Sequence, residues 1–165
     1  KEGADVSVTA TDLKTEYLEL GHEHARREKL PVSFAPQDAL DLSNLATSES
    51  GVSDYDIILC TQSQHHFPPG LLNVMFNSAA SAAKRAVIFI DGCRSSLTAL
   101  PVISLALARY KNPVMAHDSL ISFRKFFVPE ELGMLCRLGP WDSLVQARWM
   151  KPGHCLVVLD KDRVN

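Results

Sequence analysis

The chain has 165 residues, 46% of them hydrophobic and 22% charged, and its formal net charge is −2. This composition is ordinary for one domain with a single core, and the 17 dispersed basic residues form no stripe that would favour nucleic acid as a partner. No apolar run approaches the roughly 20 residues that a membrane helix needs, and residues 1–8 lack the apolar stretch of a signal peptide. We therefore predict one cytoplasmic domain over residues 1–165.

The first third of the chain predicts a strand, a helix and a second strand. Residues 6–12, VSVTATD, are rich in Val and Thr and end in an acid. Residues 15–30 have helical character, with Thr15 as the N-cap, glutamates early and arginines late, which suits the helix dipole. Residues 31–38, PVSFAPQD, predict a short second strand, and a polar connection follows at 40–54.

The middle of the chain predicts two buried strands and two helices. Residues 55–62, YDIILCTQ, form a continuous apolar run typical of a parallel strand covered on both faces. Pro68 and Pro69 suit the start of a helix, and apolar residues then recur at helical spacing as far as Ala83. Residues 86–92, AVIFIDG, predict the next buried strand, and residues 100–110 predict a further helix.

The last third predicts a helix followed by a hairpin. Residues 127–139, FVPEELGMLCRLG, carry Pro129 at the first helical position, two glutamates in the first turn and Gly139 as the stop. Residues 143–150 and 154–160 predict two strands, and the Pro-Gly turn between them favours antiparallel pairing.

The order of these elements predicts an α/β fold. It consists of a Rossmann-like, mostly parallel sheet with helices on both faces and a C-terminal antiparallel hairpin. Ligands of such sheets bind at the carboxyl ends of the strands. Four predicted strands end in polar residues: Asp12, Gln37-Asp38, Thr61-Gln62 and Asp91. Strand ends are also polar simply because they reach solvent, but four in order favour a site.

Neither the histidines nor the cysteines predict a metal centre. His22 and His24 are two residues apart on a helix and cannot easily converge with His65 and His66, so we predict no zinc site. The four cysteines are far apart in sequence and include no CxxC pair, which favours reduced thiols in the interior.

Taken in order, several motifs resemble the class I S-adenosylmethionine-dependent methyltransferases of small molecules. They are VTATDL, QDAL, YDIILCTQSQHHF and FFVPEELGMLCRLG, and with the terminal hairpin they cover residues 6–160. The resemblance implies that Asp12 holds the two ribose hydroxyls of the cofactor, since a carboxylate can accept from both. It also implies that Leu13 lies beside the adenine and that Asp38 and Ala39 contact the adenine amino group and ring.

One feature of that family does not occur in this chain. Its first strand and glycine-rich GxGxG turn would precede residue 6, and nothing similar stands anywhere in the sequence. In the family this strand lies in the middle of the sheet, and its neighbours would otherwise expose unpaired backbone. We therefore expect an N-terminally truncated methyltransferase domain, in which the chain alone could be inactive.

The segment QSQHHF, residues 62–67, falls at the expected acceptor side of the site. The resemblance places Thr61 and Gln62 near the methionine portion of the cofactor and directs His65 and His66 toward the acceptor pocket. A histidine there could act as a base because its pKa lies near neutrality, although structural roles for the pair are favoured. Arg94 could contact an acidic or polar acceptor, or could be a solvated residue at the strand end.

The function predicted from the sequence is methyl transfer from S-adenosylmethionine to the oxygen, nitrogen or carbon atom of a small-molecule acceptor. The first alternative is a non-catalytic methyltransferase-like scaffold or partner-binding subunit. The second is a nicotinamide-dependent Rossmann enzyme that uses Asp12 for ribose. The second ranks last because the QDAL and HHF segments and the hairpin suit the methyltransferase order better.

Overall fold

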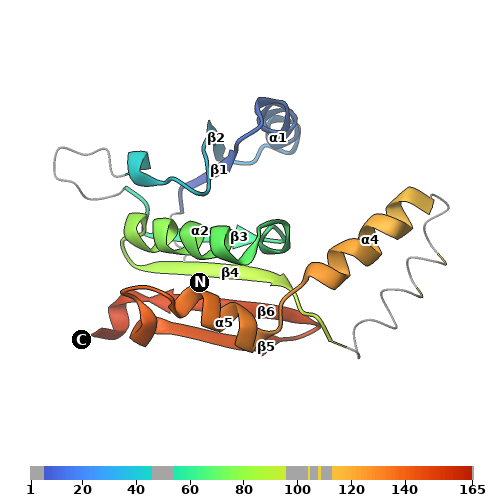
Figure 1. Cartoon of the computed structure of the whole chain (residues 1–165). Coiled ribbons are helices and arrows are strands. Elements are labelled where there is room, and N and C mark those ends of the chain that lie inside the picture. Colours follow the sequence, from blue (N-terminus) through green and yellow to red (C-terminus); the bar gives the residue numbers. More distant parts are fainter. Residues whose placement is uncertain (1–5, 46–53, 96–103, 105–107, 109–112, 165) are drawn as a thin grey trace. The chain divides into compact units, whose positions relative to one another are not determined.

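The computed structural model describes residues 6–45, 54–95, 104, 108 and 113–164. The chain divides into two compact units, Lys1–Leu42 and Ser43–Asn165 (Figure 1). The first holds two strands and a helix, and the second holds a four-stranded sheet with its helices.

The first unit is a strand–helix–strand element with parallel pairing. Strand β1 (Val8–Asp12) pairs with β2 (Val32–Pro36), and α1 (Thr15–Glu28) connects them. Helix α1 lies close to β2 at Gly21, where a Cβ would stand 2.5 Å from the Phe34 ring. These three elements confirm the order predicted for this part of the chain.

The start of α1 corrects one prediction. Lys14, not Thr15, is the N-cap residue, and Thr15 is the first residue of the helix. No side chain caps the helix, and the Lys14 N–H instead donates to Asp12 Oδ1 at 2.8 Å. The acid that ends β1 therefore also fixes the turn into α1.

The second unit is built on a sheet with the strand order β3-β4-β6-β5. Strand β3 (Ile57–Thr61) runs parallel to β4 (Ala86–Gly92), whereas β6 (His154–Asp160) is antiparallel to both β4 and β5 (Val145–Met150). The two predicted strands and the terminal hairpin are thus confirmed. Strand β4 is largely buried as predicted, whereas β3 is not covered on both faces: its residues alternate between exposed and partly buried.

Helices α2 (Pro69–Ala82) and α5 (Pro129–Arg137) pack on the same face of this sheet (Figure 1). Phe89, Val157 and Ala147 lie side by side across the strands. The Phe76 ring of α2 meets the Phe89 ring edge-on at 5.2 Å, and Gly133 of α5 packs against Ala147. The largest fully buried side chains are Phe76, Phe89, Leu72, Met75, Leu132 and Leu159.

Helix α4 (Pro113–Lys125) has no counterpart among the predicted elements. The helix predicted over residues 100–110 lies almost entirely outside the described residues. Four short 3-10 helices complete the described part of the chain: η1 (Ser43–Leu45), η2 (Gln64–His66), η3 (Asp142–Leu144) and η4 (Lys161–Val164).

The outer edge of β3 is open within the second unit. Strand β3 pairs with β4 on one side, and no strand of the second unit's described part pairs with its other side. Ile57 and Leu59 on this strand are 53% and 59% exposed. Apolar side chains of this size on an unpaired edge are a surface that most native sheets cover.

Two further predictions concern thiols and membranes. All four cysteines are free; Cys93, Cys136 and Cys155 are buried and Cys60 is partly buried, as expected of interior thiols. Within the described ranges, no helix is both long and apolar enough to span a bilayer.

Candidate active site

The first unit brings two acids to one edge of its sheet. Asp12 ends β1, and Asp38 follows β2 by two residues. Because Asp12 is opposite Pro36 in the parallel register, and Gln37 N–H donates to Asp12 O at 3.1 Å, the two acids emerge on the same side. Leu13 and Ala39 follow them, and Leu13 is 70% exposed.

Both carboxylates are held by the backbone and keep an oxygen available. Asp12 Oδ1 accepts the Lys14 N–H at 2.8 Å, and Asp38 Oδ1 accepts the Leu40 N–H at 2.9 Å. The second oxygen of each makes no hydrogen bond to another residue in the part of the chain that the structure describes. Each carboxylate is thus oriented and can still accept from a ligand.

In the second unit, the turn after β3 is tight and unusual in conformation. Gln62 has a positive φ of 55°, which is sparsely populated by residues other than glycine. Its N–H still donates to Ile90 O at 2.9 Å, so the ladder with β4 extends one residue past Thr61. Backbone strain of this kind often marks functional sites.

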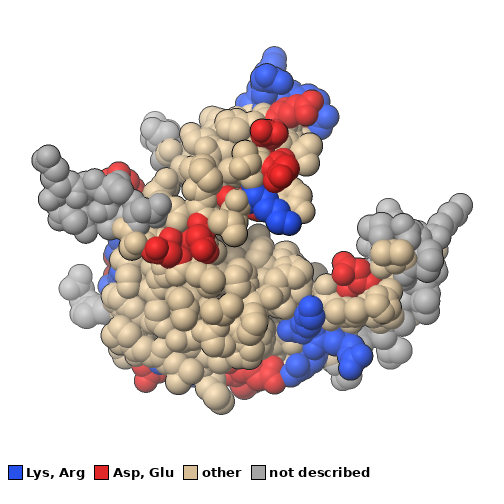
Figure 2. All heavy atoms as spheres, turned by 45° about the horizontal axis from the view of Figure 1, so that its top comes forward, with Lys and Arg blue, Asp and Glu red and all other residues tan. Residues whose placement is uncertain are grey.

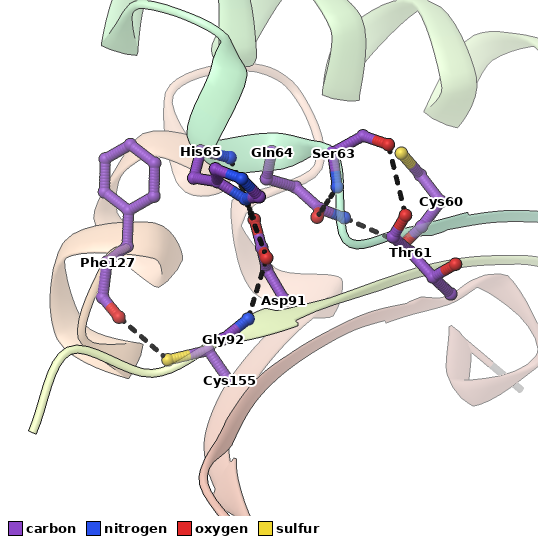
Figure 3. Close-up of polar contacts among 9 residues, drawn as sticks. All are labelled: Cys60, Thr61, Ser63, Gln64, His65, Asp91, Gly92, Phe127 and Cys155. Carbon is purple, nitrogen blue, oxygen red and sulfur yellow. Dashed lines mark hydrogen bonds and ion pairs between the residues drawn. The ribbon is translucent and has the colours of Figure 1, made fainter. Parts of the chain in front are cut away.

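Gln64 anchors this turn from within (Figure 3). It is completely buried, its Nε2 donates to Cys60 O at 2.8 Å, and its Oε1 accepts the Ser63 N–H at 3.2 Å. The amide therefore supplies hydrogen-bond partners to one backbone group near the end of β3 and one in the turn.

His65 is buried against a carboxylate. It is 8% exposed, and its Nδ1 lies 2.9 Å from Asp91 Oδ2 and 3.0 Å from Oδ1. Its backbone N–H also donates to Asp91 Oδ2 at 2.8 Å. Phe126 contacts the ring edge-on at a centroid distance of 4.8 Å. His65 is therefore a fixed part of the interior.

His66 faces outward on top of His65. It is exposed, and its ring centroid lies 4.1 Å from that of His65 at a tilt of 40°. Partial burial lowers the pKa of His66 below 6.5, and the neighbouring His65 and Lys125 lower it further. His66 is consequently neutral at pH 7 and able to accept a proton.

Arg94 is engaged by α5. Its Nη2 lies 2.5 Å from Glu131 Oε1, and its backbone N–H donates to Phe127 O at 3.1 Å. Glu131 also accepts the Val128 N–H at 3.1 Å and so caps the start of α5. The Arg94 side chain remains 43% exposed, which leaves both interpretations of Arg94 open.

The predicted residues fall into two groups. Asp12, Leu13, Asp38 and Ala39 gather in the first unit. Thr61, Gln62, His65 and His66 gather in the second, beside Asp91 at the end of β4. Sequence reasoning noted Asp91 only as a polar strand end and missed its contact with His65. The available signal was an acid directly after the buried run AVIFI.

The structure also locates the histidines that were weighed as metal ligands. His22 packs against the Phe34 ring at 4.5 Å, and His24 Nδ1 lies 2.9 Å from Arg27 Nη2. No group of three His, Cys, Asp or Glu side chains in the described ranges is arranged to hold a metal ion.

No protein-family model matches the chain, and no curated protein sequence matches it either. Many solved structures are similar, including the following three. The PH0226 protein of Pyrococcus horikoshii OT3 aligns with a TM-score of 0.63 at 17% identity, over 93% of this chain and 71% of its own. An O-methyltransferase family protein from Burkholderia thailandensis aligns with a TM-score of 0.61 at 16% identity, over 94% of this chain and 43% of its own. Magnesium protoporphyrin IX methyltransferase from Synechocystis PCC 6803, with S-adenosylhomocysteine bound, aligns with a TM-score of 0.59 at 14% identity. The alignment covers 92% of this chain and 63% of that protein.

The chain has the class I methyltransferase fold. At 14–17% identity the similarity establishes the architecture and leaves substrate and activity to be argued from the residues. The chain spans 43% and 63% of the two methyltransferases described above.

Proposed function

We propose that the chain serves S-adenosylmethionine-dependent methyl transfer to a small-molecule acceptor. The observation that carries this proposal is Asp12. In a chain with the class I methyltransferase fold, it ends β1 with one carboxylate oxygen held by Lys14 N–H and the other available. A carboxylate of this kind can accept hydrogen bonds from both hydroxyls of a ribose.

The resemblance assigns further residues to the rest of the cofactor. Asp38 would accept from the adenine amino group, and Leu13 and Ala39 would lie against the adenine ring. Thr61 and Gln62 would face the methionine portion from the end of β3. When bound, S-adenosylmethionine supplies a methyl group that the positive charge on its sulfur already activates.

The chain's own contribution to the reaction is to orient the acceptor and to take its proton. We assign the proton to His66, since this imidazole is exposed and the lowered pKa keeps it neutral at pH 7, with a ring nitrogen that can accept. His65 is instead structural, because its Nδ1 is committed to Asp91. The sequence left base catalysis and a structural role open for the His65-His66 pair. This assignment gives the first role to His66 and the second to His65.

We further propose that an additional parallel strand pairs with the open edge of β3. The edge of β3 that no described strand of the second unit pairs with supports it, and the resemblance supplies the role of the added strand. In the family, the first strand ends in the glycine-rich turn, whose backbone approaches the methionine end of the cofactor.

Calorimetric titration with S-adenosylhomocysteine tests the donor assignment. The chain and a version that includes any residues preceding Lys1 in its gene are compared, each with Asp12→Ala. Glu23→Ala is a matched control, because it removes an exposed carboxylate of α1 away from the strand ends. We expect binding that Asp12→Ala abolishes and Glu23→Ala leaves unchanged.

The other outcomes separate the alternatives. A folded, extended chain that binds NADH and not S-adenosylhomocysteine would support the nicotinamide enzyme. A folded chain that binds neither would support the scaffold. Binding that appears only in the extended version would support the additional strand.

A further inference from the structure

Asp91 is a buried carboxylate with an unusual set of donors (Figure 3). It is 1% exposed at the end of β4. It accepts the His65 N–H at 2.8 Å, the Gly92 N–H at 2.7 Å and the His65 Nδ1–H at 2.9 Å. A buried carboxylate is costly unless several donors surround it, and here one residue supplies two of the three.

The histidine tautomer follows from this geometry. An ionised carboxylate only accepts hydrogen bonds, so His65 Nδ1 must carry a proton. Among the described residues, no lysine or arginine pairs with Asp91. Asp91 therefore holds η2 at a backbone N–H and at a ring N–H together, which prevents the His65 ring from rotating.

The fixed His65 ring in turn supports His66. The Phe126 ring lies on one side of the His65 ring, with 4.8 Å between the ring centroids. The His66 ring also lies against the His65 ring, with 4.1 Å between the centroids. Phe126 itself is held close to β4, since a Cβ at Gly92 would stand 2.4 Å from its ring. The direction in which the exposed His66 faces is thus set from the end of β4.

We propose that Asp91 is a positioning residue: through its two hydrogen bonds to His65 it fixes η2 and places the His66 imidazole where the acceptor binds. The inference rests on the proposed role of His66 as the base. It adds that the acid at the end of β4 acts on that base through His65 and does not touch the acceptor.

The charges around His66 make this testable by titration. His65 of η2 and Lys125 of α4 lower the pKa of His66, whereas Asp91 of β4 and Asp118 of α4 raise it. Burial lowers it most. Arg124 and Lys125, in the last turn of α4, are exposed. Figure 2 shows basic side chains gathered in groups on the surface.

Two isosteric substitutions are then expected to shift the pKa of His66 in opposite directions. Asp118→Asn removes an exposed carboxylate near His66, so the pKa of His66 should fall. Asp91→Asn also removes a charge, and its single amide oxygen cannot accept from both His65 and Gly92 as the two carboxylate oxygens do. If Asp91 positions η2, the turn is released, His66 loses its burial, and its pKa rises toward 6.5. Imidazole ¹⁵N NMR titration of the wild type and both variants measures this.

A second pair of variants decides the matter if Asp91→Asn does not fold. His65→Asn keeps an N–H where Nδ1 stood, whereas His65→Leu has similar size and no donor. We expect His65→Asn to keep slow amide exchange over residues 64–67 and His65→Leu to lose it, with Val157 in β6 unchanged in both. Two outcomes would overturn the proposal. In one, Asp91→Asn lowers the pKa of His66 as Asp118→Asn does. In the other, amide exchange over residues 64–67 is equally fast in the two His65 variants. Because neither readout needs methyl transfer, failure here is distinct from failure of the proposed function.

Discussion

The contact between α5 and β5 allows a stability prediction with a definite sign. Gly133 is buried in the middle of α5, and a Cβ added there would lie 2.7 Å from the Cβ of Ala147. Ordinary contact begins at 3.4 Å, so Gly133→Ala forces the helix away from the sheet by the difference of about 0.7 Å. The Ala147 Cβ belongs to a strand backbone and cannot turn aside.

Two opposing effects set the magnitude. Replacing glycine by alanine inside a helix stabilises it by about 1 kcal/mol. Overpacking a well-filled interior costs about 1–3 kcal/mol. The second effect is larger, so we expect Gly133→Ala to lower the free energy of unfolding by about 1 kcal/mol.

Urea denaturation followed by circular dichroism measures this, with Gly70→Ala as the matched control. Gly70 lies in the first turn of α2, and a Cβ there meets nothing within 4 Å. That variant should therefore gain up to about 1 kcal/mol from helix propensity alone.

A double-mutant cycle identifies the cause. Ala147→Gly alone should cost about 0.5–1 kcal/mol, but combined with Gly133→Ala it removes the close contact and should recover most of the loss. The reasoning is refuted if Gly133→Ala stabilises the chain as Gly70→Ala does, or if the two substitutions are simply additive.

Three further predictions concern β3 and the turn that follows it. Gln62→Gly should stabilise the chain by about 0.5–1 kcal/mol, because relief of the left-handed φ outweighs the added chain entropy; a urea midpoint that falls would contradict this. Because the pKa of His66 is lower in the folded chain than the ordinary 6.5, the unfolded chain binds more protons just below pH 6.5, and stability decreases on acidification there. His66→Gln should lose less stability than wild type between pH 7.5 and 5.5, and identical pH profiles would exclude the effect. Burial raises the pKa of Cys60 to about 11, so at pH 8 iodoacetamide should label it only after denaturation, and rapid labelling of the native chain would show that the thiol is accessible.

The sequence identified the elements whose signals are local. The runs YDIILC and AVIFID became β3 and β4 because uninterrupted apolar, β-branched-rich residues suit strands, although only β4 is largely buried. Helix α5 began at Pro129 because proline and two glutamates suit a first turn.

The remainder depends on contacts that local patterns do not encode. Helix α4 escaped prediction because HDSLISFRK mixes polar and apolar residues without a clear single face. Lys14 replaced Thr15 as the N-cap because the first hydrogen bonds of the helix, from the N–H groups of Tyr17 and Leu18, go to the Lys14 carbonyl. The contact between Asp91 and His65 joins residues 26 apart, and only the parallel register of β3 and β4 brings them together.

The open edge of β3 also bears on how this chain behaves at high concentration. Residues 57–61, IILCT, contain no charge and no proline, the two devices that commonly keep edge strands from pairing with one another. Two copies can therefore align their β3 strands antiparallel about a twofold axis and extend one sheet into the other. We expect sedimentation of the isolated chain to show reversible association that a lysine at Leu59 suppresses, with Leu71→Lys, an equally apolar exposed position on α2, leaving it unchanged.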